Sequence, residues 1–451
     1  MKRNGNIDIF ALHPTQILVL GFAILILIGA LLLNLPIASQ NGQSIGFINA
    51  LFTATSAVCV TGLVVVDTLT YWTTFGQVVI ILLIQIGGLG FMTMGTLFAL
   101  LLGKKITLRE RLVMQEALNQ FSFSGVVRLA KYILIMTFTI EGIGAILLSI
   151  KFIPIYGLSR GIWYSIFHSI SAFCNAGFDL IGNFRSLTPF VDDVLINMVI
   201  MSLIILGGIG FVVILDVMQK KNFNKLSLHS KLAITMTLIL ISVGFFVILI
   251  LEFYNPDTMG QLSLKGKFLS ALFHSVTPRT AGFNTLPTDK LTMASIFFTI
   301  VLMFIGGSSA GTAGGVKITT TGVVIATIVS VIKGKDDTET FGRRIPRDII
   351  NRSLAIIGLA LGLVILVTMI LSITEKDSSF IGIFFEAVSA FGTVGLSLGV
   401  TSTLSKLGKI IIAITMFFGR VGPLTVLLAL AQRKKENKGI LRYPEEKVIV
   451  G

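Results

Sequence analysis

The chain has 451 residues, of which 54% are hydrophobic and only 13% are charged. Soluble proteins carry roughly 25% charged residues, so this composition excludes a set of soluble domains and predicts a multi-pass membrane protein. The 36 Lys and Arg against 22 Asp and Glu give a net charge of +14, but these basic residues lie in loops between apolar segments, which argues against nucleic-acid binding. Two cysteines and four histidines are too few for a disulfide framework or a dedicated metal cage.

Eight apolar segments are long enough to cross a membrane, for which about 20 residues are needed. They cover residues 16–37, 76–102, 130–150, 192–218, 231–252, 293–331, 350–373 and 408–431. As a single helix, the sixth segment would be about 58 Å long, nearly twice the apolar thickness of a bilayer. We expect it to be broken at the glycine- and serine-rich stretch 306–315.

The distribution of Lys and Arg predicts the orientation of the chain. Loops 1–15, 103–131, 219–231, 332–352 and 432–451 carry 24 of these residues, and the alternate loops 38–75, 151–191, 252–292 and 374–407 carry 9. An excess of Lys and Arg marks cytoplasmic loops. We therefore expect both termini in the cytoplasm and the second set of loops outside.

Each outer loop contains a short apolar stretch that ends in a glycine turn. The stretches cover 51–63, 166–178, 272–283 and 384–396, and they align on Gly62, Gly177, Gly282 and Gly395. A hydroxyl side chain precedes each glycine by six residues, or by five in the third copy: Ser56, Ser171, Thr277 and Ser389. This repeat predicts an all-α membrane protein of four units. Each unit is a span, a re-entrant half-helix and a second span, which makes eight transmembrane helices and four pore helices around one pseudo-fourfold pore.

The four turns have a physical use that ordinary loops lack. Non-helical backbone at membrane depth is tolerated only where it is buried in protein or lines a water-filled cavity. Four such turns around one axis would present rings of carbonyl oxygens that can replace the hydration shell of a cation. The alternative, ordinary outer loops with glycine turns, does not account for four similar copies on one side of the membrane.

Motifs along the whole chain carry a resemblance to a known family. They are QIGGLGFMT (85–93), GGIGF (207–211), TPRTAGFN (277–284), FGRVGPLT (418–425) and RYPEE (442–446), together with the glycine-rich break. Through them the chain resembles the Trk/Ktr/HKT superfamily of cation transporters, and within it the KtrB-type membrane subunits of bacterial Ktr potassium uptake systems. The resemblance implies four M1-P-M2 repeats, in which P is the pore helix. We expect them at 1–103, 104–219, 220–333 (with a broken M2) and 334–432, followed by a cytoplasmic tail, 433–451.

The resemblance also implies partners. It implies a homodimer in the bacterial cell membrane and a separate cytoplasmic ring of nucleotide-binding regulatory subunits, KtrA- or KtrC-like. The loop 332–352 and the basic tail 433–447 are the surfaces expected to contact that ring or anionic membrane lipids. No organic cofactor and no nucleic acid is expected.

Four triplets match the family's potassium filter position by position: Val60, Thr61 and Gly62; Asn175, Ala176 and Gly177; Thr280, Ala281 and Gly282; and Thr393, Val394 and Gly395. The fourth is most similar to the TVG core of a tetrameric potassium channel. Because the other three depart from it, we expect one good site at the glycine ring. In plant relatives that prefer sodium the first glycine position is serine, so Gly62 favours K+ as the transported ion. A role for Na+ as an activating ion stays open.

The family's gate corresponds to the break in the sixth segment: Gly306, Gly307, Ser308, Ser309, Ala310, Gly311, Thr312, Ala313, Gly314 and Gly315. Lys317 is expected to anchor the inner end of this gate loop. Arg420 is expected to face the ion path and hold the loop, since a charge at membrane depth faces a cavity or a partner. The alternative is a structural arginine that binds carbonyl groups between helices.

The favoured hypothesis is a potassium-selective, channel-like uptake protein driven by the membrane potential, and a sodium-permeable or sodium-coupled member of the same superfamily is the first alternative. An intramembrane enzyme would need convergent acid and base groups. Glu141, Asp216 and the histidines are scattered over different repeats, so we expect no enzyme. We expect Glu141 and Asp216 to pair with neighbouring helices, or else to serve an ion pathway. His168, His274 and Glu386 are expected to brace the pore helices. Cys59 and Cys174 are expected to be small buried side chains behind the filter, with a redox switch as the alternative.

Overall fold

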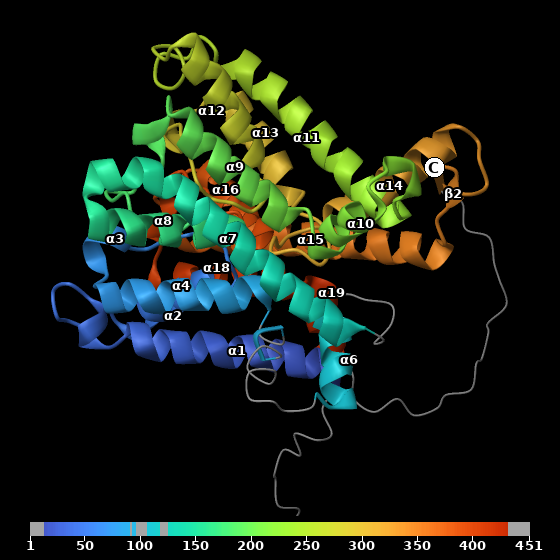
Figure 1. Ribbon diagram of the computed structural model, residues 1–451, viewed down its shortest axis with the longest axis horizontal. Helices are drawn as coiled ribbons and strands as arrows, with labels where there is room; N and C mark the ends of the chain where they lie inside the picture. The colour runs from blue at the N-terminus through green and yellow to red at the C-terminus, as the bar shows by residue number, and fades with distance from the viewer. Residues whose placement is uncertain (1–12, 91–92, 96–105, 118–124, 432–451) are drawn as a thin grey trace, which may run out of the picture.

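The computed structural model describes residues 13–90, 93–95, 106–117 and 125–431, so the predicted tail 433–451 lies outside it. Most of the described chain is helical, and strands are almost absent from it. Four long apolar helices can each cross a membrane: α1 (Pro14–Leu33), α7 (Val126–Tyr156), α11 (Leu228–Glu252) and α15 (Arg347–Thr374). They are the first helices of the four repeats. Figure 1 shows α1 and α11 on opposite edges of the molecule, with α16 and α18 between them.

Each long helix is followed by a short helix that cannot span the membrane. These are α2 (Phe47–Val58), α8 (Leu158–Phe173), α12 (Leu264–Val276) and α16 (Phe380–Gly392). At the same position in each copy lies a completely buried phenylalanine: Phe52, Phe167, Phe273 and Phe385. The predicted fold class, with four re-entrant pore helices, is therefore confirmed.

The second helices of the repeats are α4 (Thr74–Leu89), α9 (Val194–Gly208) with α10 (Phe211–Lys220), α13 (Met293–Phe304) with α14 (Ile318–Ile332), and α18 (Lys406–Val421) with α19 (Pro423–Ala431). As predicted, the sixth segment is broken, between α13 and α14. The expectation that 192–218 and 408–431 run on as single spans is wrong, because both bend by 94°. Glycine causes each bend, since Gly210 and Gly422 have φ of 96° and 94°, which other residues rarely adopt.

Smaller elements complete the loops. They are α3 (Thr68–Tyr71), α6 (Leu108–Ala117), α17 (Val400–Thr403), the 3₁₀ turns η2 (Pro36–Ala38), η3 (Thr188–Phe190), η4 (Phe223–Lys225) and η5 (Thr288–Lys290), and the strands β1 (Glu339–Thr340) and β2 (Arg343–Arg344). The two strands pair antiparallel, with Glu339 opposite Arg344 and Thr340 opposite Arg343.

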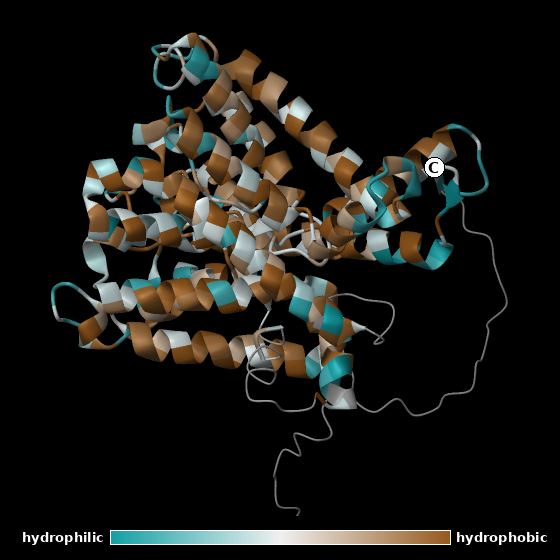
Figure 2. Cartoon of the chain, in the orientation of Figure 1, coloured by the Kyte–Doolittle hydropathy of each residue, from teal (hydrophilic) through white to brown (hydrophobic). Residues whose placement is uncertain are grey.

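The outer surface of the helices is apolar. Ile146 of α7, Ile250 of α11 and Ile365 of α15 are more than half exposed, as lipid-facing side chains of a membrane protein would be. Figure 2 shows hydrophobic residues along the lengths of these helices and hydrophilic residues gathered at loops and helix ends.

Glycines bring the second helices against the ends of the pore helices. A Cβ at Gly87, Gly207 or Gly419 would lie closer to a carbonyl oxygen than Cβ atoms come in proteins; the oxygens are those of Val58, Phe173 and Phe391 respectively. Each of these oxygens belongs to the last residues of the pore helix in the same repeat. Glycine at this position therefore allows the second helix to pack closely against the pore helix in the first, second and fourth repeats.

Gly207→Ala should lower the free energy of unfolding by about 3 kcal/mol, because the added methyl group has to displace backbone rather than a side chain. Gly362→Ala, on α15, is the matched control, since nothing lies within 4 Å of its Cβ and alanine favours the helix. Thermal denaturation of the two detergent-solubilised variants measures the difference. Equal midpoints would contradict this account of the glycine.

Candidate functional site

The four glycine turns meet in a closed ring. A Cβ on Gly62 would lie 2.5 Å from the carbonyl oxygen of Ala176, and one on Gly177 would lie 2.7 Å from that of Ala281. Gly282 faces Val394 in the same way, also at 2.7 Å, and Gly395 closes the ring against Thr61. Each turn therefore packs on the next in chain order, which brings the predicted filter triplets together around one axis.

The backbone of the four turns is the same although their sequences differ. All four glycines have φ between 70° and 91°. The residues two positions before them are left-handed as well, although none is glycine: Val60, Asn175, Thr280 and Thr393, with φ of 50° to 65°. Left-handed non-glycine residues cost of order 1–3 kcal/mol each and persist only where the surroundings impose them. Sequence reasoning missed this feature because valine and threonine carry no turn signal.

The hydroxyl groups that precede the glycines stabilise the backbone geometry that the four turns share. The amides of Gly62 and Gly395 donate to the Oγ atoms of Ser56 and Ser389, both at 3.1 Å. In the other two copies the hydroxyl donates instead: Ser171 Oγ to the carbonyl of Phe178 (2.7 Å) and Thr277 Oγ1 to that of Phe283 (2.5 Å). The hydroxyl is thus an acceptor in the first and fourth repeats and a donor in the second and third.

Amide groups inside the turns also point back to the pore helices. Thr61, Ala176 and Val394 donate to the carbonyls of Ser56, Ser171 and Ser389, each at 2.8 Å. Three threonine hydroxyls of the ring, on Thr61, Thr280 and Thr393, are buried and have no hydrogen-bond partner among the described residues. Because these amides donate to groups behind the ring, the carbonyl and hydroxyl oxygens of the turns are the candidate groups for a bound cation.

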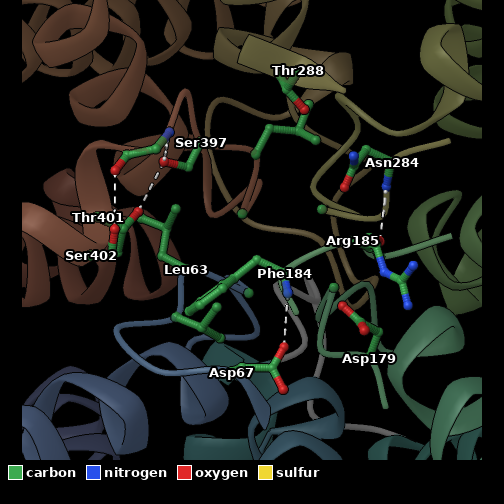
Figure 3. A pocket seen from close by; sticks show the side chains of 18 of the residues that line it. Leu63, Asp67, Asp179, Phe184, Arg185, Asn284, Thr288, Ser397, Thr401 and Ser402 are labelled. Atoms are coloured by element: carbon green, nitrogen blue, oxygen red, sulfur yellow. Dashed lines mark hydrogen bonds between the residues drawn. The ribbon is translucent and has the colours of Figure 1, made fainter. Parts of the chain in front are cut away.

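A cavity of about 470 Å³ opens directly outside the ring and is lined by all four ring glycines. Asp67 from the first repeat and Asp179 and Arg185 from the second are among the residues that line it (Figure 3). Asp67 is also structural, because its Oδ2 accepts a hydrogen bond from the amide of Phe184 (2.8 Å) and its Oδ1 one from Thr70 (2.8 Å). Sequence reasoning missed both aspartates, although each follows a filter glycine within five residues.

Asp179 lies outside the spanning helices, in surroundings that disfavour its charged form. Burial, together with the charge of Asp67, raises the pKa of the Asp179 carboxyl from 3.8 to about 6, even though the amides of Ile181 and Gly182 oppose the change. The carboxylate therefore loses its charge in a mildly acidic medium.

The loop 306–315 lies on the other side of the ring and touches three repeats. Thr312 Oγ1 donates to Asn175 Oδ1 (3.1 Å) in the second repeat, and the amide of Gly315 donates to the carbonyl of Gly419 (3.2 Å) in the fourth. A Cβ on Gly314 would collide with the side chain of Thr393. Within the third repeat, the amide of Gly306 donates to the carbonyl of Val316 (2.8 Å) and closes the base of the loop.

Arg420 joins this loop to the first repeat. Its Nη1 donates to the carbonyl of Thr312, and its Nη2 donates to the carbonyls of Gly87 (2.5 Å) and Gly88 (2.8 Å). Lys317 also contacts the loop, since its Nζ donates to the carbonyl of Ala313 (2.5 Å). These contacts agree with both interpretations of Arg420, since a structural arginine would bind carbonyl groups in the same way.

The family model described as "TrkH: Cation transport protein" matches residues 2–438. The chain belongs to this family. It is 47% identical to the Ktr system potassium uptake protein B of Bacillus subtilis and 44% identical to the potassium/sodium uptake protein NtpJ of Enterococcus hirae; these alignments cover 97% and 98% of both chains. The fold matches the crystal structure of the potassium transporter TrkH from Vibrio parahaemolyticus with a TM-score of 0.73, at 18% identity, over 96% of this chain and 87% of that one.

The remaining polar candidates of this TrkH-family chain brace its helices. His168 Nδ1 lies 2.7 Å from the carbonyl of Tyr164 and Nε2 accepts from the amide of Leu180 (3.3 Å). His274 Nε2 lies 3.0 Å from Thr299 Oγ1, and Glu386 accepts from Ser397 (2.9 Å) and Thr401.

Arg279 and Asp216 also find partners close by. Arg279 caps its own pore helix through the carbonyl of Ser275 (3.1 Å). Asp216 pairs with Lys220 of its own helix (2.8 Å) and, as expected, also contacts a neighbouring helix, because it accepts from the amide of Ser227 at the start of α11 (2.9 Å). Cys59 and Cys174 are buried free thiols. Within the described ranges no three His, Cys, Asp or Glu side chains are arranged to hold a metal ion.

Proposed function

We propose that this chain is the membrane subunit of a Ktr-type potassium uptake system and conducts K+ inward through the ring of glycine turns. The observation that carries the proposal is the closure of that ring, in which four equivalent turns bury non-helical backbone around one axis. A membrane protein tolerates such backbone only against protein or a water-filled path. The Bacillus relative named as a potassium uptake protein, at 47% identity over nearly the whole chain, supports K+ as the ion.

The selectivity filter in this proposal consists of the four triplets that end at Gly62, Gly177, Gly282 and Gly395. Their carbonyl oxygens replace water around a dehydrated K+, and the ring packing fixes the size of the site. The repeats divide at the boundaries expected from the sequence. The loop 306–315 is the gate, and the guanidinium of Arg420 adds an electrostatic barrier beneath the ring while the loop is held closed.

Direction follows from the membrane potential. An interior-negative potential contributes about 2.3 kcal/mol per charge per 100 mV, which drives K+ inward without another energy source. This direction requires the cavity lined by Asp67 and Asp179, called the vestibule below, to face the outside of the cell. It also requires both termini to lie in the cytoplasm, as the Lys and Arg distribution predicts. The function is transport rather than catalysis, since the relatives are named as potassium uptake proteins.

Partners follow from the relatives' names. A protein named as part of a Ktr system implies another component, and we propose a cytoplasmic nucleotide-binding ring, KtrA- or KtrC-like, that acts on a homodimer of this chain. The loop 332–352, with its β1–β2 hairpin and exposed Arg343 and Arg344, is the described surface that fits such a partner or anionic lipid headgroups. The name of the Enterococcus relative, a potassium/sodium uptake protein, keeps Na+ as the second candidate for a coupled or activating ion.

Rubidium uptake and growth in a potassium-uptake-deficient bacterium, with and without sodium and a regulatory subunit, test the function. Rescue at low potassium with saturable uptake is expected. Gly282→Ser should then reduce the preference for Rb+ over Na+ by about tenfold, because its Cβ presses on the Val394 carbonyl in the ring. Gly42→Ser is the control, since Gly42 also has positive φ (66°) but no neighbour within 4 Å. Unchanged selectivity in Gly282→Ser would argue against the glycine ring as the ion site.

Arg420→Ala should raise Rb+ uptake measured without the regulatory subunit several-fold, because the loop loses its tie to Thr312 and the ion path loses a positive charge. Lys409→Ala is the control: Lys409 lies in the same helix but donates to Asn49 Oδ1 (3.0 Å), away from the loop. A stable Arg420→Ala protein with wild-type uptake would support the structural interpretation instead.

Uptake at low external cation concentration should fall by about threefold as the external pH is lowered from 8 to 5, because Asp179 becomes protonated below its raised pKa of about 6 and the vestibule loses one negative charge. Asp179→Asn should show the lower rate at both pH values. Asp257→Asn, an exposed loop residue outside the vestibule, serves as the control and should keep the wild-type profile. A wild-type profile in Asp179→Asn would assign the pH dependence to another group.

A further inference from the structure

A buried acid lies behind the second turn of the ring. Glu141, in the middle of α7, is only 5% exposed, and its carboxylate accepts two hydrogen bonds from Gln85 Nε2 of α4, at 3.1 and 3.3 Å. None of the ion pairs among the described residues includes it. A carboxyl group at membrane depth is expensive to keep, so its presence calls for a function.

The thiol of Cys174 connects the carboxyl group of Glu141 to the ring. Cys174 Sγ lies 3.8 Å from Glu141 Oε1 and 4.0 Å from Gln85 Oε1, within hydrogen-bonding distance for sulfur. Gly88 also packs closely against this thiol, since a Cβ added to Gly88 would lie 2.8 Å from Cys174 Sγ. Cys174 ends the pore helix α8 and directly precedes Asn175, the left-handed residue of the second turn.

The side chain of Asn175 joins the second turn to two segments of the third repeat. Its Nδ2 donates to the carbonyl of Arg279 in the third repeat (3.0 Å), and its Oδ1 accepts from Thr312 of the loop (3.1 Å). A displacement of Cys174 would therefore be passed to the neighbouring turn and to the loop. Helix α4, which contains Gln85, also contains Gly87 and Gly88, whose carbonyl groups accept hydrogen bonds from Arg420.

We propose that Glu141 is a positioning residue that determines ion selectivity: through Cys174 and Gln85 it fixes the second turn against the first repeat and so sets the size of the ring. This inference rests on the proposed function and adds a residue outside the filter to it. The seating of the pore helix itself does not depend on the carboxylate, because Ser169 Oγ donates to the main-chain carbonyl of Glu141 (2.6 Å). An isosteric change at Glu141 therefore leaves α8 attached and alters the tie to Cys174.

The test measures uptake of ⁸⁶Rb+ and ²²Na+ by the full chain, coexpressed with a regulatory subunit in a potassium-uptake-deficient bacterium. Glu141→Gln is expected to raise the ratio of Na+ to Rb+ uptake about tenfold, with membrane insertion unchanged. The matched control is Glu252→Gln, which alters a carboxylate that is also buried and accepts from Asn255, Thr258 and Thr292 at the end of α11, without contact to the ring.

Cys174→Ala should raise the ratio in the same direction, and the double variant should add nothing further, since both changes break one connection. If Glu141→Gln does not insert, the ratio in Cys174→Ala decides. A wild-type ratio in an inserted Glu141→Gln or in Cys174→Ala, or an equal change in Glu252→Gln, overturns the inference. Absence of Rb+ uptake by the wild-type chain with its partner would instead reject the proposed function itself.

Discussion

The whole structure depends on one constraint: backbone that leaves the helical conformation inside a membrane must find partners for its polar groups within the protein. The four turns meet this constraint together. Their amides bond back to the pore helices and to hydroxyl groups such as those of Ser56 and Ser389, and each turn packs on the next. A turn without its neighbours would expose unpaired carbonyl groups to lipid. The pore helices, the hydroxyl groups and the ring glycines are therefore parts of one unit.

The backbone of the ring is nearly fourfold, but the chemistry beneath it is not. Among the described residues, the third repeat alone opens its second helix into a long loop, 306–315. The fourth repeat carries Arg420 where the first two have the glycines Gly88 and Gly208. These two departures contact each other, through the Thr312 carbonyl. The divergence of the repeats is therefore concentrated at this contact, on the loop side of the ring.

Much of the fold could be predicted from the sequence alone, because each repeat has glycine and hydroxyl residues at the positions where its turn requires them. The glycines and the hydroxyl groups five or six residues before them identified the pore helices before any coordinates. The bends at Gly210 and Gly422 were missed, since an apolar run reads as a continuous helix when one glycine lies within it. The left-handed Val60 was missed because its conformation is imposed by packing rather than preferred by valine.

Sequence by itself determined the membrane class, the four repeats and the residues of the ring, because hydrophobic length, charge asymmetry and glycine positions act locally along the chain. The tertiary structure alone decided which turn packs on which, that Arg420 binds carbonyls of two other repeats, and that Glu141 lies behind Cys174. These contacts join residues that are tens to hundreds of positions apart. No local pattern encodes them, since hydrogen bonds between distant segments exist only once the four repeats have closed around their common axis.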